Sequence, residues 1–153
     1  MPTGWNAWAT GLHHGLTHAN MTANARAARR ALADYGLDTF QIDDGVAAEI
    51  RDMGFAPGLW IQPFCVHRDS ALAAAHPGWF APKSKQGREL IPEDWLLLDP
   101  THPEAAAWLR ALFHRISHEW GYRVIKIDFI YYLLLAESYH DPNATAVQAF
   151  RRG

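Results

Sequence analysis

The sequence predicts an α/β protein in which parallel strands alternate with helices. Short apolar runs rich in β-branched residues end at Gly, Pro or Asp, and stretches with a helical period of apolar residues separate them. This order is typical of βα units, in which consecutive strands lie parallel in one sheet. The expected strands cover residues 4–9, 39–42, 57–64 and 124–129.

The first expected helix has a signal at each end. Thr22 is a residue type that caps helix N-termini, and Gly36 is one that ends helices. The helix between them should run to about Tyr35. The positions expected on its buried face are Ala25, Ala28, Leu32 and Tyr35.

The remaining helices are expected over residues 46–53, 69–75, 103–120 and 143–152. Gly54 and Gly121 end the first and third of these. The pattern is strongest in 103–120, where apolar residues recur on one face. The positions expected inward there are Ala105, Trp108, Leu109, Leu112, Phe113 and Ile116.

Residues 77–99 show no regular period. Lys83, Lys85 and Arg88 surround Gly87, and such a charged stretch around a glycine favours a solvated hairpin or loop. We therefore expect this segment to be irregular.

The expected βα units account for half of a (β/α)₈ barrel. A closed barrel takes about 250 residues and eight strands, whereas this chain has 153 residues. We expect residues 1–153 to form a single partial TIM-barrel domain, the first half of a barrel truncated on its C-terminal side. The first and fourth strands would be open edges, so we expect the chain to form a homo-oligomer or otherwise self-associate, to pair with a complementary half, or to be poorly soluble.

Charge and composition exclude several classes of partner. The formal net charge is −2 and no basic run is present, so neither nucleic acid nor an anionic membrane is expected to bind. No apolar run approaches the ~20 residues of a membrane span, and the first residues lack the pattern of a secretion signal. The single cysteine, Cys65, is expected to be a small buried hydrophobe in a reducing, cytoplasmic setting.

Carboxylates and a lysine stand where two of the expected strands end. Asp43 and Asp44 follow the second strand, and Lys126 and Asp128 close the fourth. Ligands of parallel α/β folds bind at the carboxyl ends of the strands. Carboxylates accept hydrogen bonds from hydroxyl groups and lysine donates them. These residues are therefore candidates for binding a polyhydroxylated molecule.

Each of these features also has a structural interpretation. Asp43 and Asp44 precede Gly45 and could form a plain turn, and Lys126 and Asp128 could form a structural ion pair. His114 and His118 have the i, i+4 spacing of a metal-binding pair, but no glutamate or third ligand stands at the usual spacing. We expect these two histidines on a helix surface.

Six segments, taken together and in order, resemble the catalytic domain of melibiase-type α-galactosidases, glycoside hydrolase family 36. The segments are Gly4-Trp5-Asn6-Ala7-Trp8, Gln41-Ile42-Asp43-Asp44-Gly45, Met53-Gly54-Phe55-Ala56-Pro57-Gly58-Leu59-Trp60-Ile61, His76-Pro77-Gly78-Trp79, Leu98-Asp99-Pro100-Thr101-His102-Pro103 and Tyr122-Arg123-Val124-Ile125-Lys126-Ile127-Asp128-Phe129. They span nearly the whole chain.

The resemblance implies a role for the acid that closes the fourth strand. Asp128, in a Lys-x-Asp pattern, looks like the nucleophile of a retaining glycosidase, which forms a covalent glycosyl-enzyme. Lys126 looks like a donor to sugar hydroxyls, with a charge that keeps Asp128 ionised. Two carboxyl groups suffice for this chemistry, so no metal or other cofactor is implied.

The resemblance also implies a subsite for a terminal α-galactosyl group. Asp43 and Asp44 match the pair that holds the galactose hydroxyls, and Trp8 and Trp60 match aromatic residues that line the same subsite. The implied partner is a carbohydrate, an α-galactoside.

Two departures from the family pattern leave alternatives open. The loop after Gly45 is much shorter than in the family, and no residue matches the second carboxylic acid, the acid/base of the reaction. The chain would then be an α-galactosidase-like fragment without its acid/base. The alternatives are a catalytically inactive carbohydrate-binding or assembly half barrel, and a transglycosylase or another α-glycosidase of the same clan.

Overall fold

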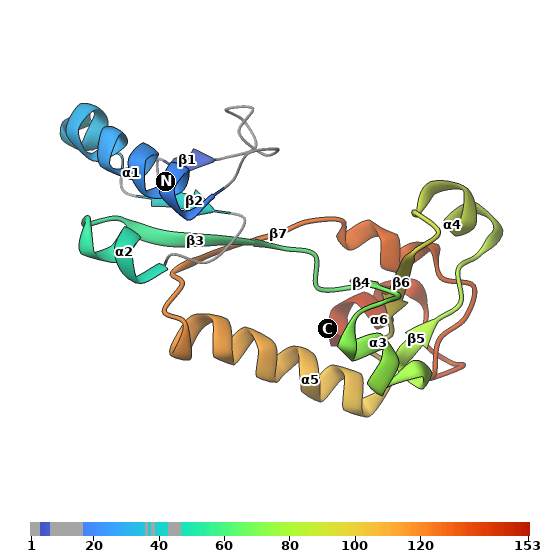
Figure 1. Cartoon of the computed structure of the whole chain (residues 1–153). Helices are drawn as coiled ribbons and strands as arrows, with labels where there is room; N and C mark the ends of the chain where they lie inside the picture. Colours follow the sequence, from blue (N-terminus) through green and yellow to red (C-terminus); the bar gives the residue numbers. More distant parts are fainter. Residues whose placement is uncertain (1–3, 7–16, 36, 38, 43–46) are drawn as a thin grey trace. The chain divides into compact units, whose positions relative to one another are not determined.

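The computed structural model describes residues 4–6, 17–35, 37, 39–42 and 47–153 (Figure 1). Contacts divide the chain into two compact units. The first unit comprises Met1–Ile61 and His114–Lys126, and the second comprises Gln62–Phe113 and Ile127–Gly153. Each unit has its own sheet.

The sheet of the first unit has the strand order β1-β2-β3-β7. Its strands are β1 (Gly4–Asn6), β2 (Thr39–Ile42), β3 (Ala56–Ile61) and β7 (Val124–Ile127). β1 pairs with β2 and β2 with β3, both parallel. The Arg123 amide donates to the Pro57 carbonyl (2.9 Å), just before β7 joins the edge of the sheet beside β3. The predicted parallel βα architecture is confirmed.

Helix α1 (His18–Leu32) begins five residues before the predicted start. Thr17, not Thr22, is the N-cap: it is extended and its Oγ1 accepts a hydrogen bond from the Asn20 amide. Thr22 lies inside the helix, where it is buried and its hydroxyl donates to the His18 carbonyl (3.0 Å). Both threonines fit the capping signal, so residue type alone could not identify the true start of the helix.

The buried face of α1 matches the prediction only over its centre. Ala25 and Ala28 are buried, whereas Leu32 is 44% and Tyr35 85% exposed. The α-helix ends at Leu32 and a 3₁₀ turn, η3 (Ala33–Tyr35), follows. Because the 3₁₀ period is three residues and not 3.6, it rotates Tyr35 away from the buried face.

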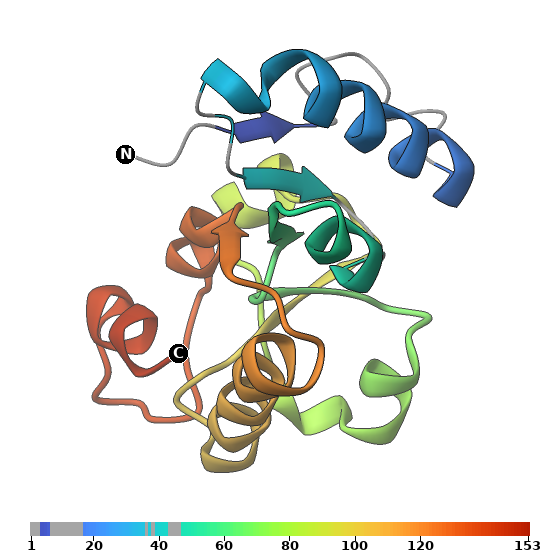
Figure 2. The ribbon, with the colours of Figure 1, turned by 90° about the vertical axis from the view of Figure 1, so that its left-hand side faces the viewer.

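The short connection between β2 and β3 forms a complete crossover. Helix α2 (Ala47–Asp52) lies in it, and Gly54, with a φ of 85°, reverses the chain into β3. Glu49 on α2 is hydrogen-bonded to His18 at the start of α1. The buried apolar side chains of this unit include Phe40, Ile50, Phe55 and Leu59. Figure 2 shows α1 running alongside β1 and β2.

The second unit contains an antiparallel sheet that the sequence analysis missed. Its strands, in the order β4-β6-β5, are β4 (Cys65–His67), β5 (Phe80–Ala81) and β6 (Trp95–Leu98). Between them lie the helices α3 (Ala71–Ala75), η4 (Pro77–Trp79) and α4 (Lys85–Leu90). The prediction that 77–99 is irregular is therefore wrong. Strands of two to four residues are too short to show a period, and their pairing is visible only in three dimensions.

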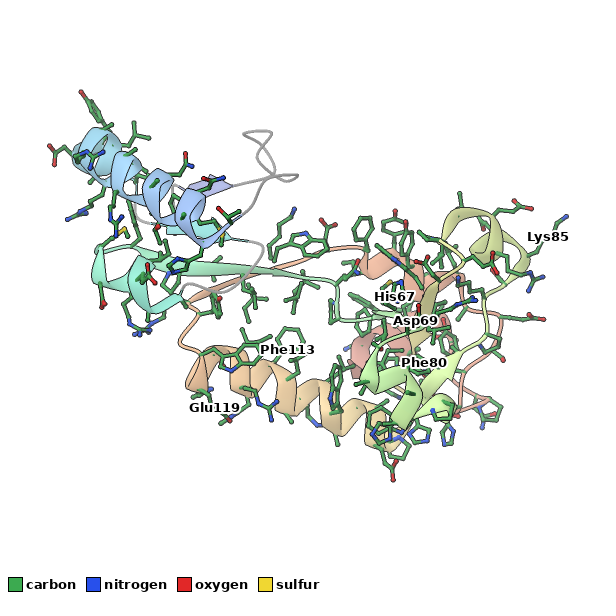
Figure 3. All side chains as sticks on the ribbon, in the orientation of Figure 1. His67, Asp69, Phe80, Lys85, Phe113 and Glu119 are labelled. Atoms are coloured by element: carbon green, nitrogen blue, oxygen red, sulfur yellow. The ribbon has the colours of Figure 1, made fainter. Side chains whose placement is uncertain are left out.

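Of the charged residues around Gly87, Lys85 and Arg88 are exposed as predicted, whereas Lys83 is half-buried and its Nζ donates to the Pro92 carbonyl (2.6 Å). Lys85 points away from the second unit in Figure 3 and is exposed. His67 and Asp69, also labelled there, face each other with Nδ1 and Oδ2 3.8 Å apart.

Two apolar clusters form the core of the second unit. One is built around Phe64, Trp79, Leu98, Ala105, Leu109 and Leu133, and the other around Cys65, Ala81, Ile91, Leu97 and Tyr132. They bring the sheet together with α5 (Pro103–His114) and the 3₁₀ helix η6 (Ile130–Leu135). Phe150 of α6 (Ala146–Arg152) packs against the first cluster.

The strongest predicted helix is confirmed, with a change of type near its end. α5 continues as a π-helical turn, η5 (Arg115–Glu119), and Gly121, with a φ of 76°, follows. Ala105, Leu109 and Ile116 are buried as expected, and Trp108, Leu112 and Phe113 are half-buried. Over the described ranges, none of the helices combines the length and apolarity needed to cross a membrane.

Candidate functional site

Of the six residues predicted to form the site, Trp60, Lys126 and Asp128 are described. Trp8, Asp43 and Asp44 lie outside the described residues. β2, which leads to the two tandem acids, ends at Ile42, where the sequence predicted.

Trp60 and Lys126 belong to neighbouring strands of the first unit's sheet. Trp60 is the fifth residue of β3 and is half-buried, and Lys126 is the third residue of β7 and is exposed. β3 and β7 are adjacent in the strand order. An aromatic side chain and a cation are thus carried near the ends of two adjacent strands, where a parallel α/β sheet presents ligand-binding groups.

Asp128, in the second unit, directly follows the last residue of β7. Its side chain is half-buried, and Oδ1 accepts a hydrogen bond from the Phe129 amide (2.9 Å). This contact orients the carboxylate against the backbone that follows the strand. Asp128 thus lies immediately after the fourth strand of the parallel sheet.

The chain turns sharply at the next residue. Phe129 has φ 51° and ψ 23°, the left-handed region that non-glycine residues rarely adopt. The strand was expected to continue to residue 129 but ends at Ile127, because this conformation cannot extend a β-ladder.

A second carboxylate, Asp99, has a structural role that the sequence analysis did not assign. It is buried, and its two oxygens accept hydrogen bonds from the amides of Thr101 (2.8 Å) and His140 (2.6 Å). The first contact is the i, i+2 bond of an Asx turn, which the Asp-Pro-Thr sequence could have indicated. Asp99 therefore ties the end of β6 to the chain that precedes α6.

The other candidates of the sequence behave as structural groups. His114 and His118 are exposed on the helix with their rings stacked (centroids 4.3 Å apart), as predicted. Cys65 is buried, and burial raises the pKa of its thiol to about 12, so it is protonated at neutral pH. Within the part of the chain that the structure describes, no three His, Cys, Asp or Glu side chains gather as a metal site would require.

A family model described as Melibiase matches residues 22–151 of this chain. The match includes Asp43, Asp44, Trp60, Lys126 and Asp128, whereas Trp8 precedes it.

Solved structures of α-galactosidases share the fold. TtGalA, the α-galactosidase of Thermus thermophilus solved in complex with stachyose, matches 99% of this chain with a TM-score of 0.74 and 24% identity. The same enzyme with p-nitrophenyl α-D-galactopyranoside matches 99% with a TM-score of 0.70 and 25% identity. The glycoside hydrolase family 36 α-galactosidase AgaB of Geobacillus stearothermophilus matches 83% with a TM-score of 0.64 and 17% identity. The chain spans 37%, 35% and 21% of those three chains, respectively.

Proposed function

The chain belongs to the melibiase family, and from this premise we propose that it carries the nucleophile half of a retaining α-galactosidase site. The observation that supports this most directly is Asp128, a carboxylate that directly follows a strand of the parallel sheet and is oriented by the Phe129 amide. The complexes of TtGalA with stachyose and with a nitrophenyl α-galactoside support an α-galactoside as the substrate class.

In the proposed reaction an Asp128 oxygen attacks the anomeric carbon of a terminal α-galactosyl group. The new bond from carbon to the Asp128 oxygen forms as the bond to the leaving oxygen breaks, and the leaving group takes that electron pair. Asp128 then carries a β-linked galactosyl ester, which water hydrolyses in a second step.

The remaining site residues are proposed to hold the sugar. Asp43 and Asp44 accept hydrogen bonds from its hydroxyls and Lys126 donates to them. Trp8 and Trp60 line the same subsite, where an indole face can cover the apolar face of a pyranose.

We further propose that these 153 residues lack the general acid/base, since none of their carboxyl groups matches it. General acid–base help is worth roughly 10²–10⁴-fold in rate, so natural galactosides should react very slowly with the chain alone. A substrate with a stable leaving anion needs no proton on the leaving oxygen and should bypass this deficit.

The test uses 2,4-dinitrophenyl α-galactoside. The chain should release a burst of dinitrophenolate and then turn over slowly, because water attack on the ester lacks its base. Asp128→Asn should abolish the burst. Asp69→Asn, which neutralises an exposed carboxylate of the same unit, should leave it unchanged. A burst that survives in Asp128→Asn would refute the assignment of the nucleophile.

The second candidate function is an inactive carbohydrate-binding half barrel. It is favoured because none of the carboxyl groups in these 153 residues matches the acid/base. Titration with galactose by calorimetry separates the two functions. Binding of galactose without any burst from the activated substrate would favour the inactive module.

A further inference from the structure

Among the described residues, Phe129 is the one non-glycine residue with a positive φ. It also directly follows the proposed nucleophile. A non-glycine side chain persists in the left-handed region only where its surroundings hold it there. We propose that Trp95 and Tyr132 pack against the Phe129 ring and thereby stabilise the strained turn that positions the Asp128 carboxylate for attack; this inference rests on the proposed function.

The Phe129 ring lies among other aromatic rings of the second unit, those of Tyr132 and Trp95 and, at a longer centroid distance of 6.5 Å, that of Tyr131. The Tyr132 ring stacks on it with a centroid distance of 5.2 Å and an interplanar angle of 19°. The Trp95 ring meets it edge-on at 5.8 Å and 79°. Trp95 and Tyr132 also contact each other edge-on at 6.3 Å, so these three rings, each in contact with the other two, form an aromatic cluster.

This aromatic cluster belongs to the core and not to a mobile surface. Tyr132 is a buried member of the apolar cluster that contains Cys65 and Leu97, against which Trp95 and Phe129 pack. The Tyr132 amide also donates to the Phe129 carbonyl (3.0 Å), which closes the turn between the two rings. Trp95 is the first residue of β6, so the antiparallel sheet of the second unit supplies one of the rings that pack against Phe129.

The position of Asp128 follows from this arrangement. The peptide that joins Asp128 to Phe129 carries the amide that binds Oδ1 of Asp128 (2.9 Å). If the Phe129 ring lost its packing against Trp95 and Tyr132, φ at this residue would relax toward ordinary negative values. That rotation would turn the peptide, and the carboxylate bound to it, relative to the core. Trp95, Phe129 and Tyr132 would then be positioning residues that act through the backbone.

The dinitrophenolate burst gives the readout. The burst rate constant at saturating substrate reports attack by Asp128, and the half-saturating concentration reports sugar binding. In Trp95→Leu we expect the rate constant to fall about 10- to 100-fold, as small misplacements of reacting groups do, with the half-saturating concentration nearly unchanged. Trp95→Phe keeps an aromatic wall and should retain most of the rate.

Trp108→Leu is the matched control. Trp108 is a half-buried tryptophan of the same unit, but it packs against the other apolar cluster. This variant also loses an indole ring, but it keeps the contacts of Phe129 with Trp95 and Tyr132. Its burst should therefore match that of the unaltered chain. Melting curves of all variants establish that they are folded.

A double-mutant cycle tests whether Trp95 acts through the strained turn. Glycine adopts a φ near 51° without strain, and it has no side-chain ring against which Trp95 and Tyr132 could pack. Trp95→Leu should therefore change the burst much less in a Phe129→Gly background than alone. Should Trp95→Leu fail to fold, the burst of Phe129→Leu is compared with that of Trp108→Leu instead of the cycle, because Phe129→Leu keeps an apolar side chain but removes the stacked ring.

The outcomes separate this inference from the proposed function. If the unaltered chain shows no burst that depends on Asp128, both the proposed function and this inference are overturned. Two outcomes would overturn the positioning role alone while the unaltered chain shows its burst. One is a burst that falls no further in folded Trp95→Leu than in Trp108→Leu. The other is that the effects of Trp95→Leu and Phe129→Gly on the burst are additive. A lower rate constant together with a coupled double mutant supports it.

Discussion

At the scale of single residues, Gly87 shows how tightly the chain after Asp128 is held. Gly87 is buried in α4, and a Cβ placed on it would lie 2.6 Å from the backbone oxygen of Leu135 in η6. The Ser84 amide donates to the same Leu135 oxygen (2.9 Å). Any side chain at position 87 would therefore push against backbone.

We predict that Gly87→Ala destabilises the chain by about 1–3 kcal/mol, the usual cost of overpacking. Gly78→Ala is the matched control, because a Cβ at position 78 would meet nothing within 4 Å. Its effect should stay within about 1 kcal/mol. Urea unfolding measures both, and equal stabilities of the two variants would show that η6 does not pack closely on α4.

Cys65 makes stability depend on alkaline pH. Burial raises the pKa of its thiol from 9.0 to about 12, with a smaller opposing effect of Lys83. Because the pKa is higher in the folded chain, its contribution is complete below pH 9 and is lost as the pH rises toward 12.

We predict that the stability difference between the unaltered chain and Cys65→Ala narrows by about 1 kcal/mol from pH 8 to pH 10. Tyr139, whose pKa burial also raises, does not interact electrostatically with Cys65, so its contribution cancels in the comparison. A difference independent of pH would mean that the thiol is not buried in solution.

At the scale of elements, α6 begins with two interlocking contacts. Thr145 Oγ1 accepts from the Gln148 amide (3.2 Å), and the Gln148 side chain accepts from the Thr145 amide (2.9 Å), which completes a capping box. Asp141 links the helix to the preceding chain through an ion pair with Arg152 (2.8 Å). The Asn143 amide and then the Arg152 guanidinium lower the pKa of Asp141, so this link weakens as the pH falls below about 4.

We predict that Thr145→Ala destabilises the second unit by about 1 kcal/mol, the usual cost of losing an N-cap. Thr145→Ser keeps the hydroxyl and should cost only a few tenths. Thermal melting followed by circular dichroism distinguishes them. If both variants melt alike, the box contributes nothing to stability.

The elements that the sequence predicted well are those with local signals. Gly54 and Gly121 end helices at positive φ, and their role could be assigned from residue type alone. The start of α1 could not, because Thr17 and Thr22 are equally good caps in sequence. The antiparallel sheet was missed because the pairing of β4 with β6 joins residues about 30 positions apart.

The candidate site was predictable to a similar degree. The position of Asp128 after the fourth strand followed from the apolar run before it. The left-handed turn at Phe129 did not, since the aromatic rings that hold it come from β6 and η6. Phenylalanine gives no local indication of a positive φ.

At the scale of the whole molecule, the chain shares the fold of its family but spans only part of the length of the solved α-galactosidases. The second unit exposes a run of large apolar side chains directly around the proposed nucleophile. These residues are Ile127, Ile130, Tyr131 and Leu134. Exposed apolar side chains grouped in this way mark interaction surfaces, so we expect them to be buried against another chain.

We predict that the chain self-associates in a concentration-dependent way. Leu134→Glu, which places a charge on this exposed run, should shift the population toward monomer in sedimentation velocity. Val147→Glu, at another exposed apolar residue of the second unit, is the control and should not. A monodisperse 17 kDa monomer at all concentrations would contradict the expectation of self-association.

If Asp128 is the nucleophile, it forms a covalent bond to the sugar, and mass spectrometry of the reacted chain detects that bond. The chain is mixed with 2,4-dinitrophenyl α-galactoside, quenched in acid during the burst and digested with pepsin. We expect one added galactosyl group, on the peptide that contains Asp128, and none in Asp128→Asn. A galactosyl group on any other residue, or a burst with no galactosyl group on the chain, would contradict it.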